Sequence, residues 1–108
     1  MTPSNLFVQF ILEIIGTFIF ILLILVVTGR ESGATNVALP IGLALALPIY
    51  LFGDITGGHF NPAVSFAIFI KNPKIFTGLM LMVYITAQVI GSFLALETNV
   101  FFNSTFFK

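Results

Sequence analysis

The chain has 108 residues, of which 58% are hydrophobic and 7% are charged, against about 25% charged residues in a typical soluble domain. So few charges cannot keep so apolar a surface in water, which excludes a soluble globular protein. The net charge is zero and the sequence has no cysteine, which argues against nucleic-acid binding and excludes disulfides, thiolate metal sites and cysteine nucleophiles. We therefore expect a membrane protein.

The first candidate membrane span covers residues 6–28. A spanning helix needs about 20 apolar residues, and this stretch carries one charge, Glu13, before it closes at Gly29-Arg30-Glu31. No Lys or Arg precedes it, and its apolar run is too long for a cleaved signal peptide. We therefore expect this segment to remain in the protein as a transmembrane helix.

The second candidate span covers residues 37–53, which are uncharged and end before Asp54. Two prolines fall within it. Pro40 lies near the start, where a proline is tolerated, whereas Pro48 removes an interior hydrogen bond. The segment therefore predicts a second transmembrane helix that is kinked at Pro48.

A further apolar stretch, residues 56–70, is too short to cross the membrane. Its helical part, from Pro62 to Ile70, would be about 14 Å long, which is half of a hydrocarbon core of about 30 Å. The preceding residues 57–61 predict extended chain, because glycine is costly in a helix and the residue before a proline is biased away from the helical region. Pro62 suits the first turn of a helix with Asn61 as its N-cap. We therefore expect a re-entrant segment.

The third candidate span covers residues 75–96, which are uncharged and end at Glu97. The tail, residues 101–108, is too short to cross the membrane and is expected at its interface. The fold class predicted from these segments is an all-α membrane protein with three transmembrane helices and one re-entrant half-helix. We expect residues 1–108 to form a single unit.

The re-entrant segment is the candidate functional site. Non-helical backbone at membrane depth is tolerated only where protein buries it or where it lines a wet cavity. The carbonyls of Gly57, Gly58 and His59 therefore need a partner such as water or a small polar solute. The helix that begins at Pro62 directs free N–H groups and a partial positive charge toward the membrane centre, and Asn61 adds an amide donor. This order of acceptors and donors predicts facilitated diffusion of a small neutral solute, while the positive end opposes cations.

Few other residues of the spans carry chemistry. Glu13 is a functional candidate because an ionisable group in a span is expensive, the alternative being a helix-packing or interfacial residue. Gln88 is typical of contacts between membrane helices. A lone His59 is poor ligand chemistry for a metal, and no nucleophile–base set can be assembled, so we expect no metal, no cofactor and no enzyme. Three glycines are expected at positions of close packing: Gly16, Gly42 and Gly91.

The segment GGHFNPAVS, residues 57–65, resembles the signature of the major intrinsic protein family, which comprises the aquaporins and glycerol facilitators. Residues 13–18, 37–54 and 84–91 are similar to parts of the first, second and third helices of that family. The resemblance implies a multi-pass channel of the cell membrane for water or small neutral solutes such as glycerol. The pore-lining residues that it implies are Ile41, Gly57, Gly58, His59, Asn61, Pro62 and Ala63.

The resemblance also implies which residues support the loop. Glu13 matches a buried glutamate that accepts hydrogen bonds from the re-entrant loop, and Gln88 matches a residue that braces it. The backbone carbonyl of His59 would line the channel while its side chain packs or forms a hydrogen bond. Two residues bear on selectivity. Ile41 stands where water-selective members place a phenylalanine, which leaves room for a broader small-solute pore, and Val64 stands at the spacing where the second half of the family carries an arginine.

The chain resembles only the first of the two inverted halves of the family. One half cannot enclose a pore, because its polar half-helix would face lipid, so we expect pairing with an inverted copy or with a complementary half. By family topology, Lys71 and Lys74 lie on one side of the membrane and Arg30 and Lys108 on the other. This near absence of positive-inside bias suits a dual-topology protein as well as a truncated half. Two alternatives stay open, namely a non-conducting fragment and a small interaction protein that modulates a full-length channel.

Overall fold

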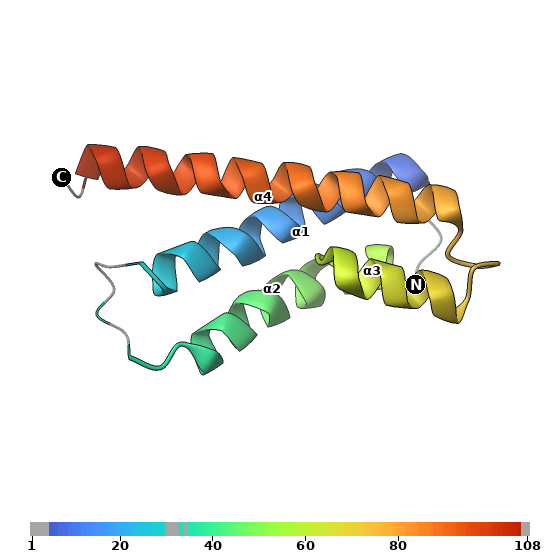
Figure 1. Cartoon of the computed structure of the whole chain (residues 1–108), viewed down its shortest axis with the longest axis horizontal. Coiled ribbons are helices and arrows are strands. Elements are labelled where there is room, and N and C mark those ends of the chain that lie inside the picture. Colours follow the sequence, from blue (N-terminus) through green and yellow to red (C-terminus); the bar gives the residue numbers. More distant parts are fainter. Residues whose placement is uncertain (1–4, 30–32, 34, 107–108) are drawn as a thin grey trace.

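The computed structural model of the chain describes residues 5–29, 33 and 35–106 (Figure 1). These residues form four helices, whose bounds are α1 Leu6–Val27, α2 Ala38–Thr56, α3 Pro62–Lys71 and α4 Gly78–Phe106. Three of them, α1, α2 and α4, are long and apolar enough to cross a membrane, and α3 is a shorter apolar helix. The predicted fold class of three candidate spans and one half-helix is therefore confirmed for the described residues.

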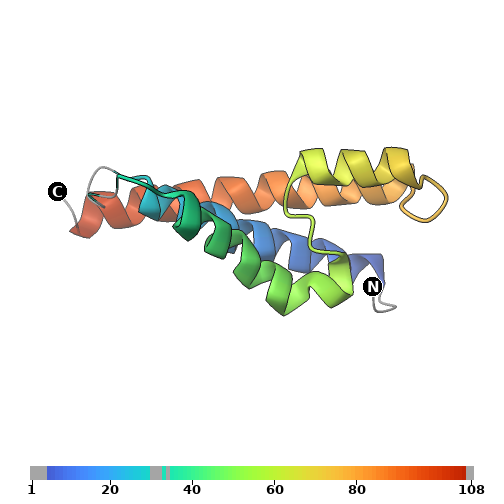
Figure 2. The same cartoon turned by 90° about the horizontal axis from the view of Figure 1, so that it is seen from below.

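The helices lie in an arrangement that places the short helix beside the longest one. α1 and α4 run side by side in the same direction, and α2 returns against α1 in the opposite direction (Figure 1). The chain that follows α2 doubles back before α3 begins, and α3 then lies along the first turns of α4 (Figure 2). The non-helical chain between α2 and α3 is thus held among three helices.

The helix ends follow from local sequence. The side chain of Asn5 caps α1 by accepting the Val8 N–H at 2.8 Å, and Asn61 caps α3 by accepting the Ala63 N–H at 2.8 Å, with Pro62 in the first turn as predicted. α2 continues through the buried Pro48 without a break in its helical assignment.

α2 also runs beyond the predicted boundary at residue 53. The helix ends at Thr56, where Gly57 adopts a left-handed φ of 90° while its N–H still bonds to the Gly53 carbonyl at 2.9 Å. The helix therefore ends at the first residue without a side chain to resist that backbone turn.

α4 differs from the predicted third span at both ends. It begins at Gly78 rather than at residue 75, because Ile75 and Phe76 belong to a turn in which both N–H groups bond to the Asn72 carbonyl. It continues to Phe106 because no glycine or proline interrupts residues 97–106. Residues 101–106, which were predicted to lie at the membrane interface, therefore continue α4, and residues 107–108 lie outside the described part.

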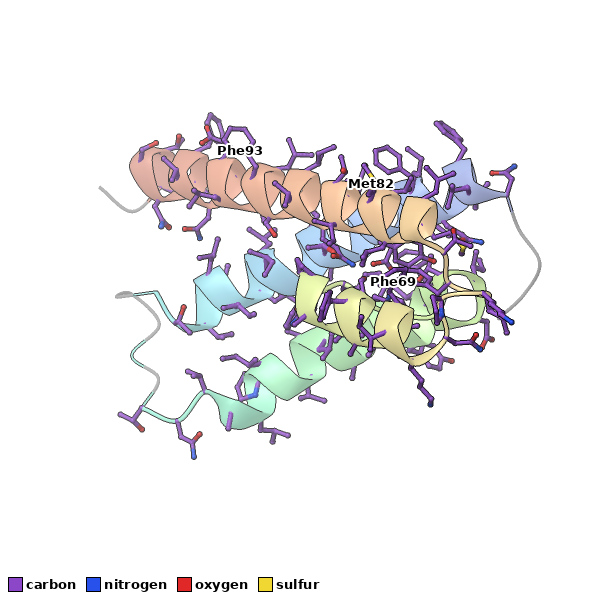
Figure 3. All side chains as sticks on the ribbon, turned by 45° about the vertical axis from the view of Figure 1, so that its right-hand side comes forward. Phe69, Met82 and Phe93 are labelled. Atoms are coloured by element: carbon purple, nitrogen blue, oxygen red, sulfur yellow. The ribbon has the colours of Figure 1, made fainter. Side chains whose placement is uncertain are left out.

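The distribution of side chains is the reverse of that in a soluble protein. Large apolar side chains cover the outside, and Met82 and Phe93, for example, lie on the outer side of α4 with 68% and 60% of their surface exposed (Figure 3). An exposed apolar surface of this extent suits lipid. Within the described part of the chain, the buried polar or charged residues are Gln9, Glu13, Thr17, Thr56, His59, Ser65 and Gln88.

Two of the three glycines that were expected to pack closely do so. A Cβ atom at Gly91 would lie 2.5 Å from the Ile14 carbonyl oxygen, so α1 and α4 approach backbone to backbone there. A Cβ atom at Gly16 would overlap the ring of Phe60. The expectation is wrong for Gly42 within the described chain, because nothing there lies within 4 Å of such an atom.

Candidate functional site

The loop between α2 and α3 has an unusual backbone. Gly57, Gly58 and Phe60 have φ values of 90°, 69° and 51°, in the left-handed region that a residue with a side chain enters at a cost of about 1–2 kcal/mol. The first two positions are glycines, which enter it freely. Phe60 is held there although it has a side chain, because its ring is 1% exposed and packs on Gly16.

The carboxylate of Glu13 anchors the loop from α1. Its Oε1 accepts the backbone N–H of Phe60 at 2.9 Å and a side-chain N–H of Gln88 at 2.9 Å. Glu13 is fully buried and Gln88 is 1% exposed, so both hydrogen bonds are shielded from water. The structure therefore brings together two residues that the sequence analysis had marked as loop supports.

The side chain of Gln88 also reaches the first turns of α3. Its Nε2 donates to the Ser65 Oγ at 2.9 Å, and this Oγ lies 2.9 Å from the His59 Nδ1. Because the hydroxyl accepts from Gln88, it is free to donate its own proton to Nδ1. Whichever ring nitrogen carries the proton, this contact gives the His59 side chain a hydrogen-bonding role, as the family resemblance implied.

Tyr84 and Ser65 complete the site and were not among the predicted site residues. The Tyr84 hydroxyl lies 2.5 Å from the Thr56 carbonyl oxygen and 3.1 Å from the Gln9 Oε1. Its ring packs against the rings of His59 and Phe76, with centroids 4.9 Å apart in each case. The available signal was spacing, since Tyr84 precedes Gln88 by four residues and shares its face of α4.

The groups expected to line a pore divide into two sets. Asn61, Pro62, Ala63 and Val64 are exposed at the start of α3, and Gly57 is exposed before it, whereas Gly58 is half-buried and the His59 side chain is buried. Ile41 lies near the other end of α2, sixteen residues before Gly57 and therefore about 24 Å along the helix. The structure gathers the loop residues and does not bring Ile41 to them.

The exposed end of α3 offers hydrogen-bond donors. The Oδ1 of Asn61 accepts the Ala63 N–H, and the amide of this exposed residue keeps two N–H donors beside the positive end of the helix dipole. The described residues include no group of three His, Cys, Asp or Glu side chains that would hold a metal ion. The exposed donors at the start of α3 can thus form hydrogen bonds with a polar group.

The sequence is similar to known proteins along most of its length. The family model described as "Major intrinsic protein" matches residues 3–105. The chain is 38% identical over 100 residues to a glycerol uptake facilitator protein of Pseudomonas aeruginosa, covering 87% of this chain and 35% of that protein. It is 41% identical over 90 residues to Aquaglyceroporin-2 of Rhizophagus irregularis, covering 77% and 28%.

A third relative comes from a mammal. The chain is 32% identical over 102 residues to Aquaporin-9 of Homo sapiens, covering 88% of this chain and 34% of that protein. The chain therefore spans about a third of the length of the curated relatives it matches. No solved structure matches the chain significantly.

Proposed function

The chain belongs to the major intrinsic protein family and is a multi-pass membrane protein, and from this premise we propose that it forms part of a channel for water or small neutral solutes such as glycerol. Members of this family are channels rather than enzymes. The names of the relatives, among them a glycerol uptake facilitator and an aquaglyceroporin, favour glycerol among the solutes. We further propose that conduction needs a second half-pore.

The observation that carries the proposal is the exposed polar end of α3. Asn61 and the residues that follow it are exposed, although an unsatisfied backbone polar group in hydrocarbon costs several kcal/mol. A narrow water-filled path between this end and a second protein surface satisfies these donors and the loop carbonyls together. The solute then exchanges its hydrogen bonds with water for hydrogen bonds with Asn61 and the carbonyls, which lowers the barrier to crossing.

The replacement Asn61→Asp tests the amide directly. Aspartate is as good an N-cap as asparagine, so its carboxylate still accepts the Ala63 N–H and the fold is retained. It removes the amide donors and adds a negative charge at the pore. We expect water and glycerol permeability of proteoliposomes, measured by stopped-flow light scattering, to fall about tenfold, equivalent to about 1.4 kcal/mol on the barrier, with little change in thermal stability.

Asn103→Asp is the matched control, because Asn103 is exposed on the last turns of α4, away from the loop. It should conduct like the wild type. If proteoliposomes with the wild-type chain swell no faster than empty ones, the result would count against conduction by this chain. It would favour the alternative that the chain is a non-conducting fragment. Wild-type conduction by Asn61→Asp would show that the amide does not contact the solute.

The partner that supplies the second half-pore is the finer part of the proposal. A second copy in the opposite orientation and a separate complementary half both place another polar end against α3. Single-cysteine variants in this cysteine-free sequence distinguish them, because labelling of Lys71→Cys from both sides of the membrane supports the inverted copy and labelling from one side supports a separate half. Co-purification with a larger relative, without transport by the chain alone, would instead support a modulator.

A further inference from the structure

The end of α2 has a hydrogen-bonding pattern that the left-handed Gly57 alone does not explain. In a continuing helix, the carbonyl of Thr56 would accept the N–H of residue 60. Here the Phe60 N–H bonds to the Glu13 Oε1 at 2.9 Å, and the Thr56 carbonyl faces the Tyr84 hydroxyl at 2.5 Å. Two side chains from neighbouring helices therefore take the two halves of one helical hydrogen bond.

The Tyr84 hydroxyl has one proton, and the distances to two nearby oxygens indicate which of them accepts it. Its oxygen is 2.5 Å from the Thr56 carbonyl oxygen and 3.1 Å from the Gln9 Oε1, so the shorter contact takes the proton. Tyr84 is fully buried, and the His59 and Phe76 rings hold its ring in place. The donor is therefore fixed in direction and shielded from competing water.

The side chains that replace this helical hydrogen bond all lie where α1 and α4 face each other. Tyr84 and Gln88 lie one turn apart on α4, and they meet Gln9 and Glu13, one turn apart on α1, each pair being separated by 75 residues in sequence. Packing of α1 on α4 therefore delivers the acceptor for Phe60 and the donor for Thr56 together. The non-helical residues 57–59 lie between these two hydrogen bonds.

We propose that Tyr84 is a positioning residue for conduction: its hydroxyl replaces the Phe60 N–H as partner of the Thr56 carbonyl, acts with Gly57 to end α2 at Thr56, and so keeps the loop carbonyls of Gly57 and Gly58 outside a helix. Glu13 holds the other half of the same bond. Without the hydroxyl, the Thr56 carbonyl loses its hydrogen-bond partner. A further turn of helix, in which a backbone N–H of the loop takes that place, then becomes more favourable. The consequence for transport rests on the proposed function, whereas the structural role does not.

Tyr84→Phe removes the hydroxyl and keeps the ring. In the full chain reconstituted into lipid bilayers, we expect magic-angle-spinning NMR to show a changed chemical shift of the Thr56 carbonyl carbon, upfield if it is left without a partner and with helical shifts at Gly57 and Gly58 if α2 extends. Proteoliposome permeability per folded channel should fall about fivefold, which corresponds to an equilibrium between loop conformations shifted by about one buried hydrogen bond. Tyr50→Phe is the control, because Tyr50 is 87% exposed on α2, and it should change neither signal nor permeability.

The outcomes separate the two proposals. Wild-type chain that does not conduct would remove the channel function, while the Thr56 and glycine signals of Tyr84→Phe still decide the role of Tyr84. Unchanged signals in that variant would overturn the role. If the variant does not fold, the wild type itself decides, because a slowly exchanging Tyr84 hydroxyl proton that correlates with the Thr56 carbonyl carbon supports the hydrogen bond, and its absence overturns it.

Discussion

Replacing Gly91 by alanine is expected to separate α1 from α4 and to destabilise the fold strongly. The added Cβ atom would lie 2.5 Å from the Ile14 carbonyl oxygen and 3.1 Å from the Phe18 nitrogen, and both are backbone atoms that cannot rotate away. Overpacking of this kind costs about 1–3 kcal/mol, and more when the neighbour cannot yield. Size-exclusion chromatography after heating in detergent measures the change, because the variant should lose its monodisperse peak at a lower temperature than the wild type.

Gly42→Ala is the matched control for this prediction. Gly42 also lies in a candidate membrane helix, α2, but nothing in the described chain lies within 4 Å of a Cβ atom there. Alanine is a better helix former than glycine by about 0.5–1 kcal/mol, so this variant should be as stable as the wild type or slightly more so. Equal stability of the Gly91 and Gly42 variants would show that α1 and α4 do not meet through Gly91.

Replacing Glu13 by alanine is expected to release the re-entrant loop. The Phe60 N–H would lose its acceptor and the Gln88 amide one of its two partners, and each unsatisfied buried donor costs about 1–3 kcal/mol. Phe60, whose φ of 51° is unfavourable, would then be free to leave the left-handed region. We expect thermal stability in detergent and permeability in proteoliposomes both to fall, permeability by at least about tenfold.

Two further variants sharpen this prediction. Glu13→Gln keeps the volume and one acceptor oxygen, so it should retain part of the stability that the alanine variant loses. Glu97→Ala removes the exposed carboxylate of α4 and should leave stability and permeability unchanged. A Glu13→Ala protein that conducts and melts like the wild type would show that the carboxylate does not hold the loop.

Much of the fold was predictable because it depends on short stretches of sequence. Long apolar runs indicate the three spans, and Asn61 with Pro62 indicates the start of α3, since capping and the fixed φ of proline act within one turn. The boundaries were less predictable. A charge such as Asp54 or Glu97 marks where the apolar run stops, but a helix continues past it until the backbone turns, as at Gly57, or until the chain offers a residue that ends it.

The candidate site likewise contains residues that were predictable from the sequence and residues that were not. The family resemblance marked Glu13 and Gln88 as loop supports, and the structure places both beside the loop, joined through one carboxylate oxygen. Ser65 and Tyr84 were missed, because a serine early in a short helix and a tyrosine in an apolar run have many ordinary roles. Ile41, which the resemblance places where water-selective members carry a phenylalanine, lies toward the other end of α2 from the loop, and its pore-lining role stays a prediction.

The sequence by itself thus determined that this protein is an all-helical membrane protein with a half-helix preceded by a glycine-rich turn, because hydrophobicity, capping and glycine conformation are local properties. Only the tertiary structure decided how that turn is held. The contacts of Glu13 with Gln88 and of Gln9 with Tyr84 each join residues 75 positions apart, and they exist only because α1 and α4 pack closely at Gly91. No local pattern specifies such a pairing, since it depends on which helix faces meet and at what depth.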